Sequence, residues 1–438
     1  MRYCVGIDLG STTTKAVIVG ESGEILGRGI TNSRSNYKVA CDVALAEALI
    51  DARFARVSGE LTPAASDAGR RERLLRGLEL RFREQQYRSH LACFAAVVLR
   101  LLDAGGPASD ARAAVEWILE RMSAETSALY AEGGRRKSDF FRDMAGSRYM
   151  HLAEQASRER GASFDRMAGL FDKAILEVEN RPADPDSFAI HARAAVRAMG
   201  ESLPGLGEAV ERAAAVPMER HAGVGTGYGR STLPFPKDRI RSEILCHGLG
   251  AHAMFPGTRT VLDIGGQDTK AIQVDSSGIV TSFQMNDRCA AGCGRYLGYI
   301  ADEMNLGLHE LGPLACGARR AVRINSTCTV FAGAELRERL SLGERREDIL
   351  AGLHRAIILR SMSLLARSGG VFDEFTFTGG VARNPAAVAA LDGLVRENYG
   401  AVSMNISPDS IYTGALGAAL FARRETVRPE SAGAEARA

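Results

Sequence analysis

The sequence predicts an α/β protein of two lobes interrupted by a large helical insertion. Two related loops indicate the lobes: Asp8–Lys15 near the N-terminus and Asp263–Lys270 in the middle of the chain. Apolar, strand-like runs precede and follow each loop, as they do in a β-hairpin. From about residue 39 to about residue 216, apolar residues recur at helical spacing instead. A helical segment therefore separates two stretches of strand-and-loop sequence.

The composition is that of an ordinary globular protein. The chain has 438 residues, enough for two or three domains, of which 45% are hydrophobic and 25% charged. A formal net charge of +2 argues against nucleic acid or an anionic membrane as a partner. The longest apolar run, Leu91–Leu99, ends at Arg100 and is too short to cross a bilayer. The N-terminus lacks the apolar region of a signal peptide, so we expect a cytoplasmic protein.

The strands and helices follow from local patterns. Residues 1–30 alternate strand-like runs with turn signals, which predicts a meander, and the helical insertion comes next. The strand pattern resumes after residue 217, with later helices at Asp348–Arg367 and Ala386–Tyr399. The predicted strands are Cys4–Ile7, Ala16–Val19, Ile25–Ile30, Val261–Ile264, Ala271–Val274, Val280–Gln284, Glu374–Thr378 and Ala401–Ile406.

These patterns divide the chain into five parts. We expect residues 1–38 to form the first part of lobe I, 39–216 the helical insertion, 217–258 the rest of lobe I, 259–424 lobe II, and 425–438 a flexible tail.

The two loops have the chemistry of phosphate-binding turns. Their Gly, Ser and Thr residues let backbone N–H groups approach phosphate oxygens closely. The aspartate that opens each loop, Asp8 or Asp263, is placed to act on a hydrated metal ion or on an attacking water. Two such hairpins facing each other would hold the triphosphate of a nucleotide.

Two further glycine-containing segments complete a fixed order of elements. Thr378-Gly-Gly-Val-Ala-Arg-Asn384 ends a strand and opens a helix, and Tyr412-Thr-Gly-Ala-Leu-Gly-Ala-Ala419 opens the last helix. This order resembles the superfamily of actin, sugar kinases and heat-shock-70 ATPases, in which two ribonuclease-H-like lobes hold ATP in a cleft.

The resemblance implies a role for each loop residue. Asp8 would organise Mg²⁺ through water, and Asp263 or Gln267 would position the attacking water. Such a site works by positioning and charge stabilisation. The phosphates would be held by Gly10, Ser11, Thr12, Thr13 and Lys15 from one lobe and by Gly265, Gly266 and Lys270 from the other, and the adenosine by Gly379, Gly380 and Asn384.

Cys289 and Cys328 each follow a predicted strand and precede a predicted helix, the strand before Cys328 being Ala321–Ile324. A helix N-terminus lowers the pKa of a thiol and favours the thiolate. Two thiolates do not complete a four-cysteine iron–sulfur site, but a second subunit with the same positions would complete it. On physical grounds alone, cluster ligation, a buried or capping cysteine and a redox disulfide all remain open.

The motifs around these cysteines resemble the ATP-dependent electron activator family. They are Asp263-Ile-Gly-Gly-Gln-Asp-Thr-Lys, Met285-Asn-Asp-Arg-Cys-Ala-Ala-Gly, Ser326-Thr-Cys-Thr-Val-Phe-Ala and Thr378-Gly-Gly-Val-Ala. The family includes activators of 2-hydroxyacyl-CoA dehydratases and the ATPase subunits of benzoyl-CoA reductase. The resemblance implies ATP, Mg²⁺ and one [4Fe–4S] cluster shared by two ATPase protomers, with Cys289 and Cys328 as this chain's ligands.

Two features depart from the small activators. Position 293 is Cys instead of Thr, and we expect Cys293 to pack or to lie behind the ligands; Cys316, in a predicted loop, is not expected to be a ligand. The insertion at 39–216 resembles instead the larger ATPase subunit of class I benzoyl-CoA reductase. The implied partners are then a shorter paralogous ATPase subunit, two reductase subunits that bind the acyl-CoA, and ferredoxin.

The implied function is an ATP-hydrolysing oxidoreductase subunit. It would pass electrons from reduced ferredoxin to the reductase subunits, which dearomatise benzoyl-CoA to a cyclic dienoyl-CoA. The alternatives are an activator of a 2-hydroxyacyl-CoA dehydratase, a small-metabolite kinase of the same superfamily, and a non-catalytic ATPase scaffold. His247 and His252 lack a nearby third ligand and are expected to be ordinary surface or capping histidines.

Overall fold

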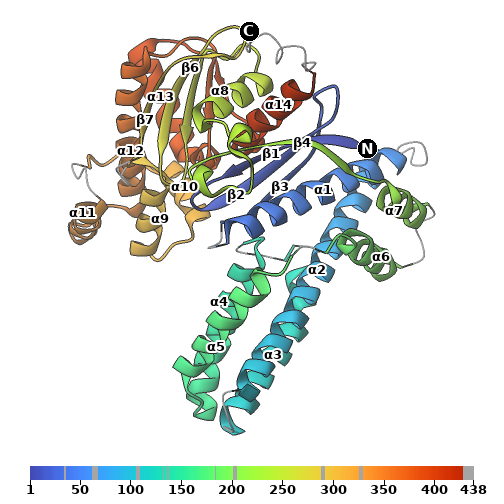
Figure 1. Ribbon diagram of the computed structural model, residues 1–438. Coiled ribbons are helices and arrows are strands. Elements are labelled where there is room, and N and C mark those ends of the chain that lie inside the picture. Colours follow the sequence, from blue (N-terminus) through green and yellow to red (C-terminus); the bar gives the residue numbers. More distant parts are fainter. Residues whose placement is uncertain are drawn as a thin grey trace. The chain divides into compact units, whose positions relative to one another are not determined.

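The computed structural model describes most of the chain and divides it into two compact units. The described residues are 1–33, 36–61, 68–104, 109–131, 133–134, 136, 138–182, 184–200, 205–287, 292–324 and 329–427. One unit comprises Arg34–Met218 together with Met1, and the other comprises Arg2–Ser33 and Glu219–Ala438. The second unit contains the strands and both candidate phosphate loops (Figure 1).

The first sheet is built from the two segments that flank the long insertion in the sequence. Its strands are β1 (Arg2–Leu9), β2 (Thr13–Val19), β3 (Ile25–Asn32) and β4 (Glu219–Thr226), in the order β3-β2-β1-β4. The first three form the predicted antiparallel meander, whereas β4 pairs with β1 in parallel. In the β1–β2 hairpin, Asp8 lies opposite Lys15.

The second sheet repeats this plan. Its strands are β5 (Thr260–Ile264), β6 (Thr269–Val274), β7 (Val280–Asn286), β8 (Phe375–Thr378) and β9 (Met404–Asn405), in the order β7-β6-β5-β8-β9. Here too a meander comes first, and β8 then pairs with β5 in parallel. Asp263 lies opposite Lys270, as Asp8 lies opposite Lys15.

Two helices, α8 (Glu243–Met254) and α14 (Thr413–Val427), pack beside the first sheet. Their approach is close because a Cβ at Gly417 would overlap the carbonyl of Cys246, and one at Gly6 would overlap the backbone of α14. The opposite side of α8 packs on the second sheet through Ile244 and Ala251. Helix α8 therefore contacts both sheets.

The remaining helices of this unit share an apolar core with the second sheet. They are α9 (Gly294–Glu303), α10 (Leu308–Cys316), α11 (Thr329–Ser341), α12 (Arg346–Ser368) and α13 (Pro385–Tyr399), and the short 3₁₀ turns are η1 (Arg230–Thr232), η2 (Lys237–Arg239), η4 (Gly380–Arg383) and η5 (Pro408–Tyr412). In the described part of the chain, α12 alone is long and apolar enough to cross a membrane, but 61% of its most apolar stretch is buried. Because Ile349, Leu353 and Ile357 lie in the apolar core, we assign α12 as a core helix.

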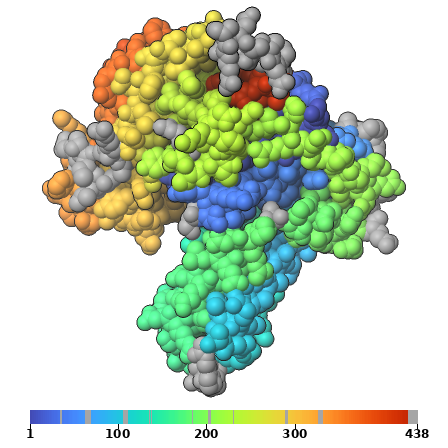
Figure 2. All heavy atoms as spheres, in the orientation of Figure 1, coloured from blue at the N-terminus to red at the C-terminus, as the bar shows by residue number. Residues whose placement is uncertain are grey.

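The other unit is entirely helical and has two apolar cores. Its helices are α1 (Tyr37–Leu61), α2 (Ala68–Ala104), α3 (Ser109–Leu129), α4 (Phe141–Arg160), α5 (Phe164–Glu179), α6 (Ser187–Met199) and α7 (Leu206–Ala215). Phe94, Tyr149 and Phe171 pack together in one core, and Phe82 and Phe188 pack in the other. On the face shown in Figure 2, the atoms of α2 to α5 form one continuous surface.

Two local predictions are wrong. Ala321–Ile324 forms no strand, because the N–H of Val322 donates to the carbonyl of Asp348 at 3.0 Å instead of to a neighbouring strand. Cys316 does not lie in a loop but is the last residue of α10, where it is exposed. Cys293 is buried and precedes α9 directly, as expected of a packing residue.

Candidate functional site

The two predicted phosphate hairpins face each other. A Cβ built on Gly266 in the β5–β6 turn would lie 2.8 Å from Oγ1 of Thr12 in the β1–β2 turn. Lys15 of the first hairpin is also close enough to help lower the pKa of Asp263 in the second. The two turns that the sequence places far apart therefore meet in the folded chain.

The first turn is held in shape by the end of β3. The Ser33 hydroxyl donates to the carbonyl of Gly10 at 2.6 Å, and the Ser33 N–H donates to the carbonyl of Thr12 at 2.8 Å. A Cβ on Gly10 would lie 2.7 Å from the Thr13 carbonyl, so the turn requires glycine there. Asp8 is buried at the base, Thr13 and Lys15 are half-buried, and Ser11 and Thr12 are exposed.

Both carboxylate oxygens of Asp263 have polar partners nearby. Its Oδ1 accepts a hydrogen bond from the Thr378 hydroxyl at 2.8 Å. Its Oδ2 lies 3.5 Å from Nζ of Lys270 and 3.7 Å from Nε2 of His247. Burial raises the pKa of Asp263, but His247, Lys270 and the Thr378 hydrogen bond outweigh it, so the pKa is lowered. The side chain is held as a carboxylate.

Lys270 is paired inside the protein. It is buried, and its Nζ lies 2.8 Å from Oδ1 of Asp268 as well as close to Asp263. Burial lowers the pKa of Lys270, but Asp263, Asp268 and Glu243 raise it by more than burial lowers it. The net pKa is therefore raised, and the side chain remains charged. In this arrangement Lys270 supports the carboxylates of the hairpin, and direct contact with phosphate stays a prediction. Gln267, the other candidate for holding the attacking water, is half-buried in the same turn.

The predicted adenosine residues lie at the end of β8. Gly379 has a φ of +86°, and a Cβ there would overlap the backbone of Ile264. Gly380 is exposed and a Cβ on it would meet nothing within 4 Å, which leaves room for a flat ring. Asn384 caps α13, because its Oδ1 accepts from the N–H groups of Ala386 and Ala387 at 3.0 and 3.2 Å. Its role toward adenosine stays a prediction.

Two residues of this site escaped the sequence analysis. His247 was expected to be an ordinary surface or capping histidine, but it is buried in α8 and faces Asp263. Glu243, one helical turn earlier, is also buried; burial raises the pKa of its carboxyl, and Lys270 and His247 offset only part of that effect. Their four-residue spacing within an apolar helix was the available signal, since it places both on one face.

The second hairpin is joined directly to the start of α9. The N–H of Gly294 donates to the carbonyl of Gly265 at 2.8 Å, and the N–H of Arg295 donates to the carbonyl of Gly266 at 2.8 Å. The Thr269 hydroxyl donates to the carbonyl of Gly292 at 2.5 Å. A displacement of this hairpin would therefore be transmitted to α9 through backbone hydrogen bonds.

The predicted cluster ligands, Cys289 and Cys328, lie outside the described residues. The described chain resumes at Gly292, just before α9, and at Thr329, where α11 begins. Within the described ranges, no group of three or more His, Cys, Asp or Glu side chains could hold a metal ion. The ligand role of the two cysteines stays a prediction.

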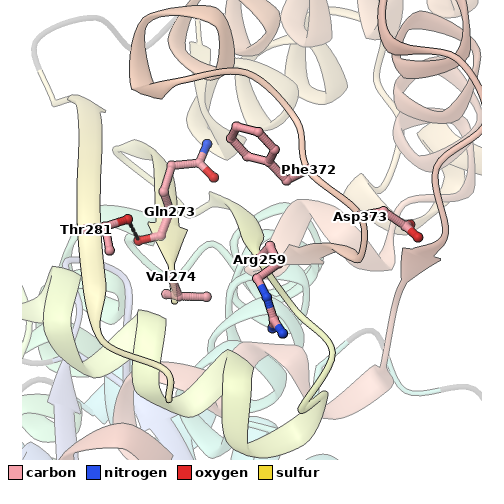
Figure 3. Close-up of a pocket in the computed structure, with 6 residues that line it drawn as sticks. All are labelled: Arg259, Gln273, Val274, Thr281, Phe372 and Asp373. Carbon is pink, nitrogen blue, oxygen red and sulfur yellow. Dashed lines mark hydrogen bonds between the residues drawn. The ribbon is translucent and has the colours of Figure 1, made fainter. Parts of the chain in front are cut away.

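A separate hollow of about 380 Å³ lies at the other end of the second sheet. It is lined by Arg259, Gln273, Val274, Thr281, Phe372 and Asp373 (Figure 3). These residues lie just before β5, at the end of β6, at the start of β7 and just before β8, whereas the phosphate turn joins the opposite ends of β5 and β6. The hollow is therefore distinct from the hairpin site.

Sequence comparison places the chain among known ATPases. Residues 5–422 match the BadF/BadG/BcrA/BcrD ATPase family. The chain belongs to this family. An activating ATPase of (R)-2-hydroxyglutaryl-CoA dehydratase from Acidaminococcus fermentans is 43% identical over 203 residues, which cover 46% of this chain and 75% of that protein. A benzoyl-CoA reductase subunit from Thauera aromatica is 34% identical over 196 residues, covering 45% of this chain and 69% of the relative.

The fold is also that of a solved family structure. Component A of the A. fermentans (R)-2-hydroxyglutaryl-CoA dehydratase superposes with a TM-score of 0.55 at 24% identity, covering 98% of this chain and 100% of the other. The two-sheet α/β ATPase fold and the resemblance to the electron activators are thereby confirmed.

Membership of this ATPase family implies ATP with Mg²⁺, and the residues present fit such a ligand. The glycines of both turns allow backbone N–H groups to approach phosphate closely, and the buried carboxylates of Asp8 and Asp263 suit a hydrated cation.

Proposed function

We propose that this BadF/BadG/BcrA/BcrD family ATPase is an electron activator that couples ATP hydrolysis to the transfer of low-potential electrons. The observation that carries the proposal is the pair of backbone hydrogen bonds that the start of α9 donates to the carbonyls of Gly265 and Gly266. The sequence places Cys289 between this hairpin and this helix. A change at the γ-phosphate would thus be passed to the start of α9, five residues after the proposed cluster ligand in the sequence.

The nucleotide is proposed to lie between the two hairpins. Asp8 would organise Mg²⁺ through water, the first hairpin would hold the phosphates together with Gly265 and Gly266, and Gly379 and Gly380 would face the adenosine. Asp263 or Gln267 would orient the attacking water. Asp263 suits this role because its charge is maintained inside the protein by Lys270 and Thr378. Positioning of this kind supplies most of the catalysis in phosphoryl transfer.

Cys289 and Cys328 are proposed to hold one half of a [4Fe–4S] cluster. A second ATPase protomer, either a shorter paralogue or another copy, would supply the other two thiolates. When bound, the cluster supplies the one-electron carrier between reduced ferredoxin and the client enzyme. We place this chemistry in the cytoplasm.

The client proposed first is a 2-hydroxyacyl-CoA dehydratase. Support comes from the relative in A. fermentans, an activating ATPase of (R)-2-hydroxyglutaryl-CoA dehydratase that is 43% identical to this chain over 203 residues. The identity to the benzoyl-CoA reductase subunit is lower, at 34% over 196 residues.

Benzoyl-CoA reductase is the second candidate, and the helical unit Arg34–Met218 favours it. A compact unit with two apolar cores of its own offers a surface for docking on additional subunits, such as two that bind the acyl-CoA. In that case the electrons would dearomatise benzoyl-CoA to a cyclic dienoyl-CoA.

Iron content and cluster spectroscopy test the proposal. The chain would be purified without oxygen, alone and with its genomic neighbours, and iron per protomer measured with the electron paramagnetic resonance spectrum after reduction. We expect about two irons per protomer, from four shared by two chains. Cys289→Ser and Cys328→Ser should lose them, whereas Cys316→Ser, at an exposed position at the end of α10, should keep them. An iron-free protein that still hydrolyses ATP would refute the electron-activator proposal.

The client is identified by adding each enzyme in turn. Electrons delivered from reduced ferredoxin to a 2-hydroxyacyl-CoA dehydratase, measured as dehydration of the thioester, support the first candidate. Dearomatisation of benzoyl-CoA, with no activation of the dehydratase, supports the second.

A further inference from the structure

His247 occupies the junction of the two hairpins. It lies on α8, the helix that contacts both sheets, and its side chain is buried. Its Nε2 is 3.7 Å from Oδ2 of Asp263, on the second hairpin. A Cβ on Gly414, at the start of α14, would lie 2.7 Å from Cε1 of His247 and 2.7 Å from Oδ2 of Asp8. The imidazole therefore lies near the aspartates of both hairpins.

The ring has a fixed orientation. Its Nδ1 lies 2.8 Å from the carbonyl oxygen of Glu243, which accepts hydrogen bonds and donates none, so Nδ1 carries a proton and donates. This contact directs Nε2 toward Asp263. The 3.7 Å separation is slightly longer than a hydrogen bond. Catalytic hydrogen bonds are often long in the absence of substrate and shorten in the reactive complex.

Asp263 is held on both of its oxygens. The Thr378 hydroxyl donates to Oδ1 at 2.8 Å, and Lys270 and His247 both face Oδ2. Lys270 is divided between Asp263 and Asp268, with the shorter distance to Asp268. Among the residues that the structure describes, His247 is thus the group near the second oxygen of Asp263 that has no other carboxylate at hydrogen-bond distance.

We propose that His247 is a positioning residue for ATP hydrolysis, which fixes the Asp263 carboxylate so that the attacking water is oriented correctly. The inference rests on the proposed function, because it requires ATP hydrolysis between the hairpins. It assigns His247 no contact with the nucleotide. Its loss should therefore lower kcat and leave the KM for ATP unchanged.

Two substitutions at one position separate this role from simple packing. In His247→Gln, the side-chain amide can still donate from near the position of Nε2, whereas in His247→Asn it reaches only the position of Nδ1. We expect His247→Asn to lose about 10- to 100-fold in kcat, the usual effect of removing a group that orients a ligating or catalytic side chain. His247→Gln should recover much of that loss.

His252→Asn is the matched control. His252 lies on the same helix, but its ring faces Gly278 instead of the hairpins. We expect the control to keep the wild-type kcat and KM. Thermal unfolding of all three variants, with and without ADP, shows whether a change in kcat reflects a loss of folding.

The outcomes distinguish this inference from the proposed function. Equal kcat for the Asn and Gln variants, or a change confined to KM, overturns the positioning role while the electron-activator proposal stands. A wild-type protein that does not hydrolyse ATP overturns both. If His247→Asn does not fold, His247→Gln decides the question. Folded His247→Gln protein with near wild-type kcat supports the positioning role. His247→Gln protein that is unfolded, or folded but inactive, overturns it.

Discussion

The backbone N–H of Gly294 donates to the carbonyl of Gly265 at 2.8 Å. This hydrogen bond joins the first residue of α9 to the turn that follows Asp263. Since both partners are backbone groups of glycine residues, no flexible side chain lies between the turn and the helix. A shift of the turn on nucleotide binding must either move α9 or break the bond.

Gly294→Ala should weaken this connection. The new Cβ would lie 3.1 Å from the Gly265 carbonyl and 3.5 Å from Cγ2 of Val381, so α9 must move away by a few tenths of an ångström. We expect a loss of about 1–3 kcal/mol in the free energy of unfolding, as for other overpacked sites. Hydrogen–deuterium exchange should also show a smaller nucleotide-dependent change in α9.

Gly298→Ala is the control for that experiment. Gly298 lies one turn further along α9, and a Cβ there would meet nothing within 4 Å. Because alanine is the better helix former, the control should gain up to about 1 kcal/mol. If both variants keep the wild-type response of α9 to nucleotide, this hydrogen bond does not transmit the shift.

Gly417→Ala should destabilise the protein strongly. The added methyl group would overlap the carbonyl of Cys246, where α14 crosses α8. Neither backbone can move easily, since α14 also lies against Gly6 of β1. We expect a loss of about 3 kcal/mol or more in urea denaturation. Gly393→Ala in α13 is the control, because a Cβ there would meet nothing within 4 Å, and it should be neutral or stabilising. Equal stability of the two variants would show that α8 and α14 separate readily.

Thr378→Val should impair both stability and ATP hydrolysis. The substitution keeps the shape of the side chain but removes the 2.8 Å hydrogen bond to the buried Asp263. A buried acceptor left unsatisfied costs about 1–3 kcal/mol. Thr376→Val, on the same strand, breaks a contact with Thr258 at 2.6 Å and should lower stability alone. A Thr378→Val enzyme with wild-type kcat would contradict the assignment of Asp263 to the reaction.

His354 should make stability dependent on pH near neutrality. Its Nδ1 donates to the carbonyl of Leu350 at 2.7 Å, and its Nε2 accepts from the side-chain amide of Asn384 at 2.9 Å, which requires a neutral ring. Burial lowers the pKa of His354 and the Leu350 contact offsets only part of this. Its contribution is complete above the ordinary histidine pKa of about 6.5 and declines as pH falls toward the lower folded value.

The measurement is urea denaturation at pH 7.5 and at pH 5.5. We expect His354→Gln to reduce the loss of stability between these pH values, because glutamine does not titrate. His221→Gln, at an exposed position, should behave as the wild type does. An unchanged pH dependence in His354→Gln would rule out a neutral histidine beside Asn384.

The parts of the fold that could be predicted from the sequence depend on local signals. The glycine-rich turns after Asp8 and Asp263 lie between short apolar runs, and each forms the hairpin that this pattern indicates. The helical spacing of Leu91, Phe94 and Val98 reflects one buried face of α2. Such patterns can be interpreted without knowledge of what packs against them.

The remaining features depend on distant partners. The apolar segment Ala321–Ile324 resembles a strand, but α12 approaches it so closely that a Cβ on Gly352 would overlap the carbonyl of Val322. In the candidate site, His247 has a possible role only because α8 lies between the sheets and brings it to Asp263. The distant contact itself leaves no local signal in either case, and the four-residue spacing of Glu243 and His247 indicates only that they share a helix face.

The repeated plan of the two sheets has a consequence for where the long connections of this protein lie. In the first sheet, the long connection runs from β3 to β4 and contains the whole helical unit. In the second, the corresponding connection runs from β7 to β8 and contains α9 to α12 along with Cys289 and Cys328. In each sheet, the long connection follows the third strand of the meander and leads to the strand that pairs in parallel with the first. One connection thus holds a whole helical unit and the other holds the two proposed cluster cysteines, while the two hairpins of the candidate site lie outside both connections.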